Sequence, residues 1–296
     1  MDEIIGYREK KTGIYTLEDV DLFNILCIPR IAELESVELK IIVEKALNYC
    51  KEKRAFMLID IPREINNAKN VKNWIEDNKY IRHENSAVYF PSIYIKDPKN
   101  DNNLRNVSTS GSIAGLFARI DAERGVWKAP TGTEAVLNGV EKLDYSLTDS
   151  EIDDLNSVGI NCLKNSVSHG KVCWGARTLV GSDKESSEWK YIPVRRLCLF
   201  IEESIFKGTK WIVFEPNDKS LWYKIRQHAG AFMHNLFRQG ALQGTTPNEA
   251  YFVKCGQQTI TQTDIKQGIV NIVVGFAPVR PAEFVIIKIQ HKTNQT

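Results

Sequence analysis

The feature that most constrains this chain is its C-terminal stretch, two short apolar runs divided by prolines. The first run, residues 270–276, has four apolar side chains on one face, as in a mostly buried strand: Val270, Ile272, Val274 and Phe276. The second run, residues 283–289, is apolar on both faces. Such a strand needs cover on both faces and partners along its edges. We therefore expect it to be docked, in its own sheet or against another molecule, and completion of its own domain is the commoner outcome.

Composition excludes several classes of protein. At 296 residues the chain is long enough for two domains, and its net charge of +2 predicts no bulk attraction to nucleic acid or to an anionic membrane. No apolar run approaches the ~20 residues that span a bilayer, so direct membrane insertion is not expected. The six cysteines are scattered without metal-ligand spacing, which favours reduced, inert thiols in a protein folded in a cytoplasm. We expect no metal and no cofactor.

The first half of the chain alternates strands and helices. Apolar runs at 23–29, 55–62 and 87–95 predict strands, and 3.6-residue stripes at 37–54 and 67–78 predict the helices between them. This order favours an α/β fold with a parallel sheet and right-handed crossovers.

The remaining segments are less regular. Residues 1–15 are polar and are expected to hold little structure of their own, and 96–106 is expected to be a polar loop. Further elements are predicted as a helix from 108 to 125, paired strands at 159–163 and 172–179, a helix at 194–205, a strand at 211–216, a long helix capped by Asn217 or Asp218, and a strand at 250–255. The second half is therefore expected to be α+β.

One constellation invites a test for catalysis. Asp60, His83 and the serines Ser110 and Ser112 occur in the chain order of a subtilisin-type triad. The histidine lies in RHEN and the serines in STSGS, without the glycines and proline that surround such a triad, and serines at a helix start are capping residues by default. Phosphate-binding glycine loops and the HExxH pattern are also absent from the sequence. We expect no catalytic residues and no enzyme activity, with a serine hydrolase as the remote alternative.

Seven stretches of the sequence carry motifs of a known family, and the most distinctive begins at residue 121. Residues 121–130 read DAERGVWKAP, residues 174–179 read WGARTL, residues 211–218 read WIVFEPND, and residues 281–290 read PAEFVIIKIQ. Three further stretches agree: 91–98, 155–163 and 189–204. In this number and order the motifs resemble contractile tail sheath proteins, those of phages and of phage-tail-like injection particles.

The resemblance implies a structural role. It implies an α/β domain that is called subtilisin-like for its topology and is not catalytic, followed by a smaller α+β domain. It implies subunits stacked as six-membered rings in a helical tube around an inner tube, whose contraction drives that tube through a target membrane. The implied partners are other sheath subunits, the inner tube protein, and baseplate and terminator proteins. The implied place is a phage tail or phage-tail-like particle assembled in the cytoplasm.

The resemblance also changes the expectation for the terminal strand. Family members link subunits through exchanged terminal arms, so residues 279–296 become a predicted arm that augments a neighbour's sheet. The predicted partner-binding residues of this arm are Glu283, Phe284, Val285, Ile286, Ile287, Lys288 and Ile289. The predicted parts of the chain are then a polar segment 1–16, an α/β domain 17–185, an α+β domain 186–278 and the arm 279–296.

The chain departs from the family at its start, because only some 16 residues precede the first matching segment and no arm strand can be recognised there. A truncated form, a partial gene product, or a variant that co-assembles with a longer sheath paralogue would each account for this. A baseplate or terminator adaptor that shares the sheath domain is the alternative function.

The helix predicted at 194–205 supplies a second set of candidate contact residues. Its apolar stripe, Leu197, Ile201 and Ile205, is expected to face inward. Four charged side chains are expected to be more exposed and available to other subunits or to the inner tube: Arg195, Arg196, Glu202 and Glu203. A merely solvated face is the equal alternative, since exposed pairs contribute only ~0–1 kcal/mol each.

Overall fold

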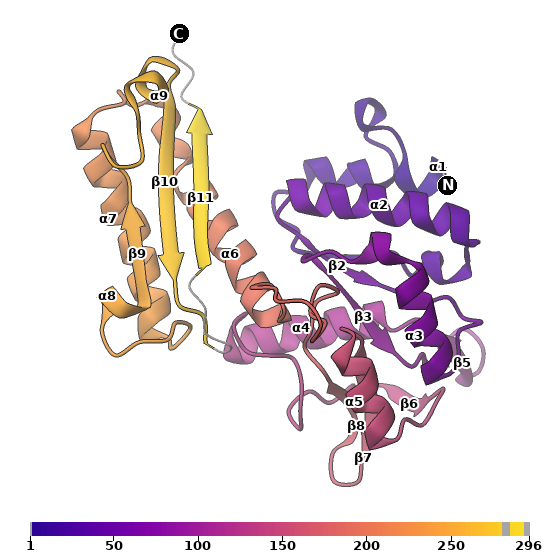
Figure 1. Cartoon of the computed structure of the whole chain (residues 1–296). Helices are drawn as coiled ribbons and strands as arrows, with labels where there is room; N and C mark the ends of the chain where they lie inside the picture. The colour runs from indigo at the N-terminus through magenta and orange to yellow at the C-terminus, as the bar shows by residue number, and fades with distance from the viewer. Residues whose placement is uncertain (1, 280–284, 293–296) are drawn as a thin grey trace. The chain divides into compact units, whose positions relative to one another are not determined.

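The computed structural model describes residues 2–279 and 285–292, and the chain forms two compact units. Unit 1 is Met1–Arg196 and unit 2 is Leu197–Thr296 (Figure 1). The division falls inside helix α6 (Ile192–Gly208). Each unit has its own sheet and is described separately.

Unit 1 is built on a five-stranded sheet in the order β1-β2-β3-β7-β8. The first four strands run parallel and β8 pairs antiparallel with β7. Their bounds are β1 (Ile25–Cys27), β2 (Phe56–Ile59), β3 (Ser86–Phe90), β7 (Asn161–Ser166) and β8 (Gly170–Trp174). The predicted parallel α/β pattern is confirmed, and so is the hairpin that joins the last two strands.

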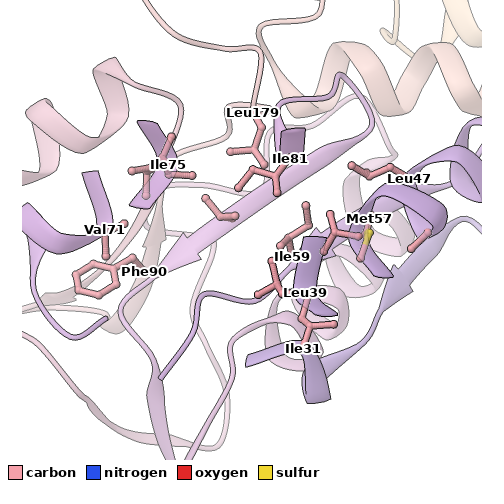
Figure 2. Close-up of a cluster of buried hydrophobic side chains, with 14 of the residues drawn as sticks. Ile31, Leu39, Leu47, Met57, Ile59, Val71, Ile75, Ile81, Phe90 and Leu179 are labelled. Atoms are coloured by element: carbon pink, nitrogen blue, oxygen red, sulfur yellow. The ribbon is translucent and has the colours of Figure 1, made fainter. Parts of the chain in front are cut away.

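Helices cover both faces of this sheet. One face packs Met57, Ile59 and Val88 against the apolar stripes of α2 (Ser36–Glu52) and α3 (Ala68–Asp77), as Figure 2 shows in part. Helix α5 (Asp149–Ser157) adds Ile152 and Leu155 to the same core. The alternate side chains of the strands point to the other face, where Tyr89 meets Phe117 of α4 (Ser110–Arg124) edge to face. A strand buried on both faces has to be apolar throughout, and β2 reads Phe-Met-Leu-Ile.

A second, three-stranded antiparallel sheet of unit 1 corrects two predictions. Its order is β5-β4-β6, with β4 (Ile93–Asp97), β5 (Asn103–Val107) and β6 (Val140–Leu143). The predicted strand 87–95 is divided in two around Pro91, a residue that cannot donate to a strand ladder. The predicted loop 96–106 contains a hairpin instead, in which main-chain pairing runs through polar residues.

The N-terminal residues are also more ordered than predicted. Helix α1 (Asp2–Ile5) and two 3-10 turns, η1 (Arg8–Lys10) and η2 (Gly13–Asp19), lead to β1. Ile5 and Ile14 are buried, and ion pairs join Lys53 to Glu18 (2.8 Å) and Arg8 to Glu18 (3.5 Å). The expected lack of structure is wrong because Ile5 and Ile14 are buried, and because Arg8 and Glu18 pair with Glu52 and Lys53 at the C-terminal end of α2. Two further 3-10 turns belong to unit 1, η3 (Pro29–Glu33) and η4 (Lys79–Ile81).

Unit 2 has a three-stranded antiparallel sheet in the order β11-β10-β9. Its strands are β9 (Tyr251–Lys254), β10 (Ile269–Phe276) and β11 (Val285–Lys292), and its helices are the greater part of α6, α7 (Lys219–Arg238), α8 (Pro247–Ala250) and α9 (Gln262–Lys266). The four apolar residues predicted on one face of β10 are fully buried. Asp218 caps α7 by accepting from the N–H of Leu221 (2.8 Å), as predicted.

Residues 211–216 do not form the predicted strand. A 3-10 turn, η5 (Lys210–Phe214), occupies this place between α6 and α7. Four consecutive apolar residues do not distinguish a strand from a helical turn, and here the turn buries Ile212 while it reverses the chain.

Candidate functional site

The structure tests the expected exposure of the charged residues on α6. Arg195 and Arg196 are 8% and 5% exposed, so the prediction that they lie on an open face is wrong. Leu197, Ile201 and Ile205 are buried as predicted. Buried arginines have to be paired or hydrogen-bonded, because an unpaired buried charge is strongly unfavourable.

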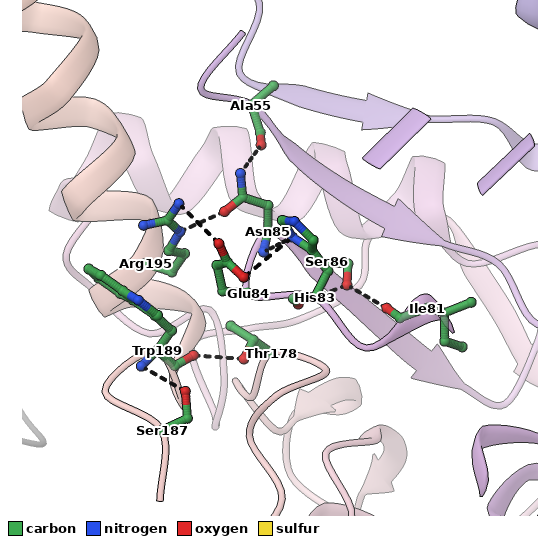
Figure 3. A network of polar contacts seen from close by, with 10 residues as sticks. All are labelled: Ala55, Ile81, His83, Glu84, Asn85, Ser86, Thr178, Ser187, Trp189 and Arg195. Carbon is green, nitrogen blue, oxygen red and sulfur yellow. Dashed lines mark hydrogen bonds and ion pairs between the residues drawn. The ribbon is translucent and has the colours of Figure 1, made fainter. Parts of the chain in front are cut away.

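Arg195 lies in a polar network at the amino end of β3 (Figure 3). Its Nε donates to the Oδ1 of Asn85 at 2.6 Å, its Nη2 lies 3.9 Å from Glu84, and its guanidinium covers the ring of Trp189 at 4.5 Å. Asn85 is itself fully buried and donates from Nδ2 to the carbonyl of Ala55 (3.2 Å). The planar guanidinium is thus hydrogen-bonded at its edge and stacked on its face, a site that lysine would not fit.

Trp189 is held in place by the connection that precedes α6. Its carbonyl accepts from the hydroxyl of Thr178 (2.7 Å), and its N–H donates to the hydroxyl of Ser187 (3.2 Å), as Figure 3 shows. The carbonyl of Lys190 accepts from the N–H of Thr178 (3.0 Å). The start of α6 is therefore fixed within unit 1 by main-chain and side-chain bonds together.

Arg196 makes a two-pronged ion pair with Asp121 on α4. Its Nη1 donates to Oδ1 at 2.9 Å and its Nη2 to Oδ2 at 2.5 Å, while its guanidinium lies 4.7 Å from the ring of Phe117. Such a pair is geometrically specific, and breaking a buried one leaves an uncompensated charge. Asp121 was missed as a partner, although it opens the DAERGVWKAP motif and Arg196 belongs to the motif at 189–204.

Glu202 and Glu203 lie on the part of α6 that belongs to unit 2 and are partly exposed. Glu203 lies 3.8 Å from Lys207, one turn along the helix, and Glu202 accepts from the thiol of Cys198 (3.4 Å). Their role in contacts between subunits stays a prediction.

The predicted terminal arm lies in the sheet of its own chain. β11 pairs with β10 over eight residues, from Ile269 opposite Lys292 to Phe276 opposite Val285. Glu283 and Phe284 lie outside the described residues, and only the backbone of residues 285–289 is described. The intramolecular docking seen here is the outcome first expected from the apolar pattern, while exchange between subunits stays a prediction.

Of the hypothetical triad, the structure brings Asp60 and Ser110 together but leaves His83 apart from them. Asp60 follows the carboxyl end of β2, and His83 precedes the amino end of β3. Because β2 and β3 run parallel and are about 13 Å long, these two residues lie at opposite ends of the strands. The Asp60 carboxylate accepts directly from the N–H (2.9 Å) and the hydroxyl of Ser110. A triad requires the histidine between the acid and the serine, and Nδ1 of His83 instead accepts from the N–H of Asn85 (2.9 Å).

Asp60 has a structural use at this place. It holds the first turn of α4 through Ser110, and Thr109 contributes a longer bond at 3.5 Å. Burial raises the pKa of Asp60 to about 6, although the hydrogen bonds from Ser110 and Thr109 act in the opposite direction. A carboxylate at a helix start also meets the positive end of the helix dipole.

Among the residues that the structure describes there is neither a group of metal ligands nor a membrane-spanning helix. Within residues 2–279 and 285–292 no group of three or more His, Cys, Asp or Glu side chains is arranged to hold a metal ion. In the same described residues no helix combines the length and apolar character needed to cross a membrane.

Comparison with known proteins points to one family over nearly the whole chain. Residues 11–179 match the family described as phage tail sheath protein central domain, and residues 184–292 match the phage tail sheath C-terminal domain. The tail sheath protein of Vibrio phage KVP40 is 31% identical over 144 residues, 48% of this chain and 21% of that protein. The chain spans about half or less of the length of the curated relatives that it matches.

Solved structures agree with the sequence matches. A chain of the anti-feeding prophage baseplate is similar with a TM-score of 0.74 and 32% identity, over 93% of this chain and 70% of that chain. A chain of the sheath complex of an extracellular contractile injection system, PVC, in its contracted state is similar with a TM-score of 0.74 and 29% identity, over 94% and 74%. The mixed α/β fold described above is therefore shared with contractile sheath structures.

Proposed function

This chain belongs to the phage tail sheath protein family, and we propose that it is a structural subunit of a contractile sheath. The observation that carries the proposal is the pair of adjoining family matches, central domain followed by C-terminal domain, which together cover residues 11–179 and 184–292. The similarity to a contracted sheath over 94% of this chain supports it.

In the proposed assembly, copies of this chain stack with one another or with a longer sheath paralogue as six-membered rings around an inner tube. Contraction of the assembly drives the inner tube through a target membrane, and baseplate and terminator proteins bind its ends. The free energy for contraction is stored in alternative packings of subunits. Assembly of the particle takes place in the cytoplasm.

The parts of the chain have separate tasks in this proposal. Residues 17–185 form a domain of subtilisin-like topology that serves as a scaffold without catalysis, which agrees with the direct bond between Asp60 and Ser110. Residues 186–278 form the smaller α+β domain. Residues 279–296 form an arm, and Glu202 and Glu203 supply contacts on α6.

The arm is proposed to exchange between subunits. β11 lies at the edge of its sheet and is bonded to β10 through the main chain. A neighbour's β11 presents the same backbone groups, so it can take the same place without new side-chain contacts. Main-chain bonds of this kind link subunits while the domains around them repack.

Electron microscopy of the purified full-length chain, alone and mixed with the inner-tube protein of the same particle, tests the proposal. We expect rings or tubes of regular width in the mixture. Uniform small particles in both samples would contradict a sheath role. They would favour an adaptor at the baseplate, a second candidate that the similarity to a baseplate chain supports.

A further inference from the structure

The charges of this chain are unevenly divided between its two units. Unit 2 carries 11 Lys and Arg against 7 Asp and Glu, whereas unit 1 carries 28 against 30. The acidic excess is concentrated, since residues 143–163 contain five carboxylates and no Lys or Arg. Opposite charges collected on separate parts of one subunit favour contacts between copies.

Three of the basic residues of unit 2 line one surface cavity. This cavity, about 440 Å³ in volume, lies between the first turns of α7 and the end of β9. Lys219, Arg226 and Lys254 line it together with the buried Trp222, and the described residues of its wall include no carboxylate. We call this cavity the α7–β9 pocket.

The three cations that line the α7–β9 pocket still have N–H groups that can donate to an occupant. Arg226 is fixed at the wall because its Nη1 donates to the carbonyl of Cys255, and this bond uses one of its five N–H groups. Lys219 and Lys254 have no carboxylate within 4 Å among the described residues, and Lys254 lies 5.0 Å from the ring of Phe252. Three cations around one cavity repel one another, so carboxylates from an occupant are stabilising there.

The matching carboxylates are on α5 of unit 1. Asp153 and Asp154 are exposed and, among the described residues, have no cation within 4 Å. The other acids of this helix have local partners: Glu151 closes the capping box with Thr148, and Asp149 lies 3.9 Å from Lys164. The capping box fixes the start of this helix, so Asp153 and Asp154 are held on a formed element at little entropic cost.

The other acidic stretches are poorer matches. In residues 18–21, Glu18 and Asp19 already pair with Lys53 and Lys11. Residues 33–38 contain three glutamates, but Glu33 pairs with Arg63 at 2.8 Å and basic residues stand close on both sides, Arg30 and Lys40. Charge complementarity therefore favours α5 as the occupant.

We propose that α5 of one subunit docks on the α7–β9 pocket of another copy of this chain, with Asp153 and Asp154 facing Lys219, Arg226 and Lys254. This inference rests on the proposed function, because it is a contact between subunits. Exposed ion pairs are individually weak and screened by salt, so the contact is reversible and sensitive to ionic strength.

Zero-length cross-linking tests the contact. The full-length chain is mixed in equal amounts with its ¹⁵N-labelled form, treated with a carbodiimide that joins contacting amines and carboxylates, and analysed by mass spectrometry. We expect linked peptides of mixed mass that join Lys219 or Lys254 to Asp153 or Asp154. The double variant Lys219→Glu, Lys254→Glu lacks the reactive amines, so its association is measured by sedimentation instead. Self-association should weaken about tenfold or more relative to the wild type, since like charges then face each other. The exposed pair Lys72→Glu, Lys99→Glu is the matched control and should leave self-association unchanged.

A charge exchange makes the test specific. Mixing Lys219→Glu, Lys254→Glu with Asp153→Lys, Asp154→Lys should restore mixed-mass links, now between the new lysines and the new glutamates. The inference is overturned if the wild-type links are absent, join other carboxylates or occur only within one chain, if self-association survives charge reversal, or if the charge exchange restores no mixed-mass links. If tubes form without this link, the proposed function stands and the docking contact is wrong. If the link forms without rings or tubes, the docking contact stands and the proposed function is wrong.

Discussion

The two units bury their sheets to different degrees. In unit 1 the strands β2 and β3 are covered by helices on both faces, and the outer edge of β8 is bonded by residues 132–137. In unit 2 the sheet has three strands, and β11, at one edge, is the last element of the chain. A sheet closed on both faces and at its edge is complete within one subunit, whereas an edge strand near a chain end can pair with another molecule. We therefore expect the main sheet of unit 1 to be complete within one subunit, and the sheet of unit 2 to be the one that can share a strand with a neighbour.

The largest effect is expected from removing the arm. Deleting residues 280–296 should abolish rings and tubes in electron micrographs while the shortened chain stays folded and soluble, because exchanged strands link subunits without completing the core. Thermal unfolding followed by circular dichroism checks the fold. An unfolded or aggregated unit 2 would instead show that β11 completes its own sheet, and unit 2 would then be as self-contained as unit 1.

The second effect concerns the buried ion pair of Arg196 and Asp121. Arg196→Ala should lower the free energy of unfolding by about 3 kcal/mol, because it removes two charge-assisted hydrogen bonds to Asp121, whose carboxylate is only partly exposed to water. Urea denaturation measures the change. Arg63→Ala is the control, since Arg63 and Glu33 form an exposed pair and should contribute only about 0–1 kcal/mol. Equal losses of stability in both variants would show that the Arg196–Asp121 pair contributes no more than an exposed pair.

The third effect is a pH dependence from Asp60. Its pKa is raised from 3.8 to about 6, so its contribution to stability is full below pH 3.8 and is lost as the pH rises through 6. Relative to Asp60→Asn, the wild type should therefore lose on the order of 3 kcal/mol between pH 4 and pH 7, since each pKa unit is worth about 1.4 kcal/mol. The difference between the two urea midpoints at each pH isolates this group from other carboxylates. A difference that does not vary with pH would mean that Asp60 has an ordinary pKa.

The smallest effect on stability is expected from Glu202 and Glu203. The double variant Glu202→Lys, Glu203→Lys should change the free energy of unfolding by at most about 1 kcal/mol, because both side chains are partly exposed. If they contact other subunits, the same variant should assemble poorly. Normal tubes, with an unchanged unfolding midpoint, would show that these residues form a solvated face.

Local patterns in the sequence predicted the elements that depend on local physics. The 3.6-residue stripe of α2, the all-apolar strand β2, the cap of α7 by Asp218 and the buried face of β10 follow from periodicity and from the hydrogen-bonding needs of helix ends. Motifs spread over the chain indicated the family in the same way. These features could be predicted because the residues that cause each one lie within a few positions of one another.

Only the tertiary structure decided where the charges of α6 lie. Helical periodicity predicted an open face for Arg195 and Arg196, yet their partners Asn85 and Asp121 come from segments 110 and 75 residues away. The hairpin of β4 and β5 was missed because β5 is mostly polar and is held by main-chain pairing with β4; β4 pairs on its other side with β6, which lies far along the chain. A buried charge needs an opposite charge or hydrogen-bond acceptors, and for these two arginines distant segments supply them, so their burial depends on how the whole sheet folds.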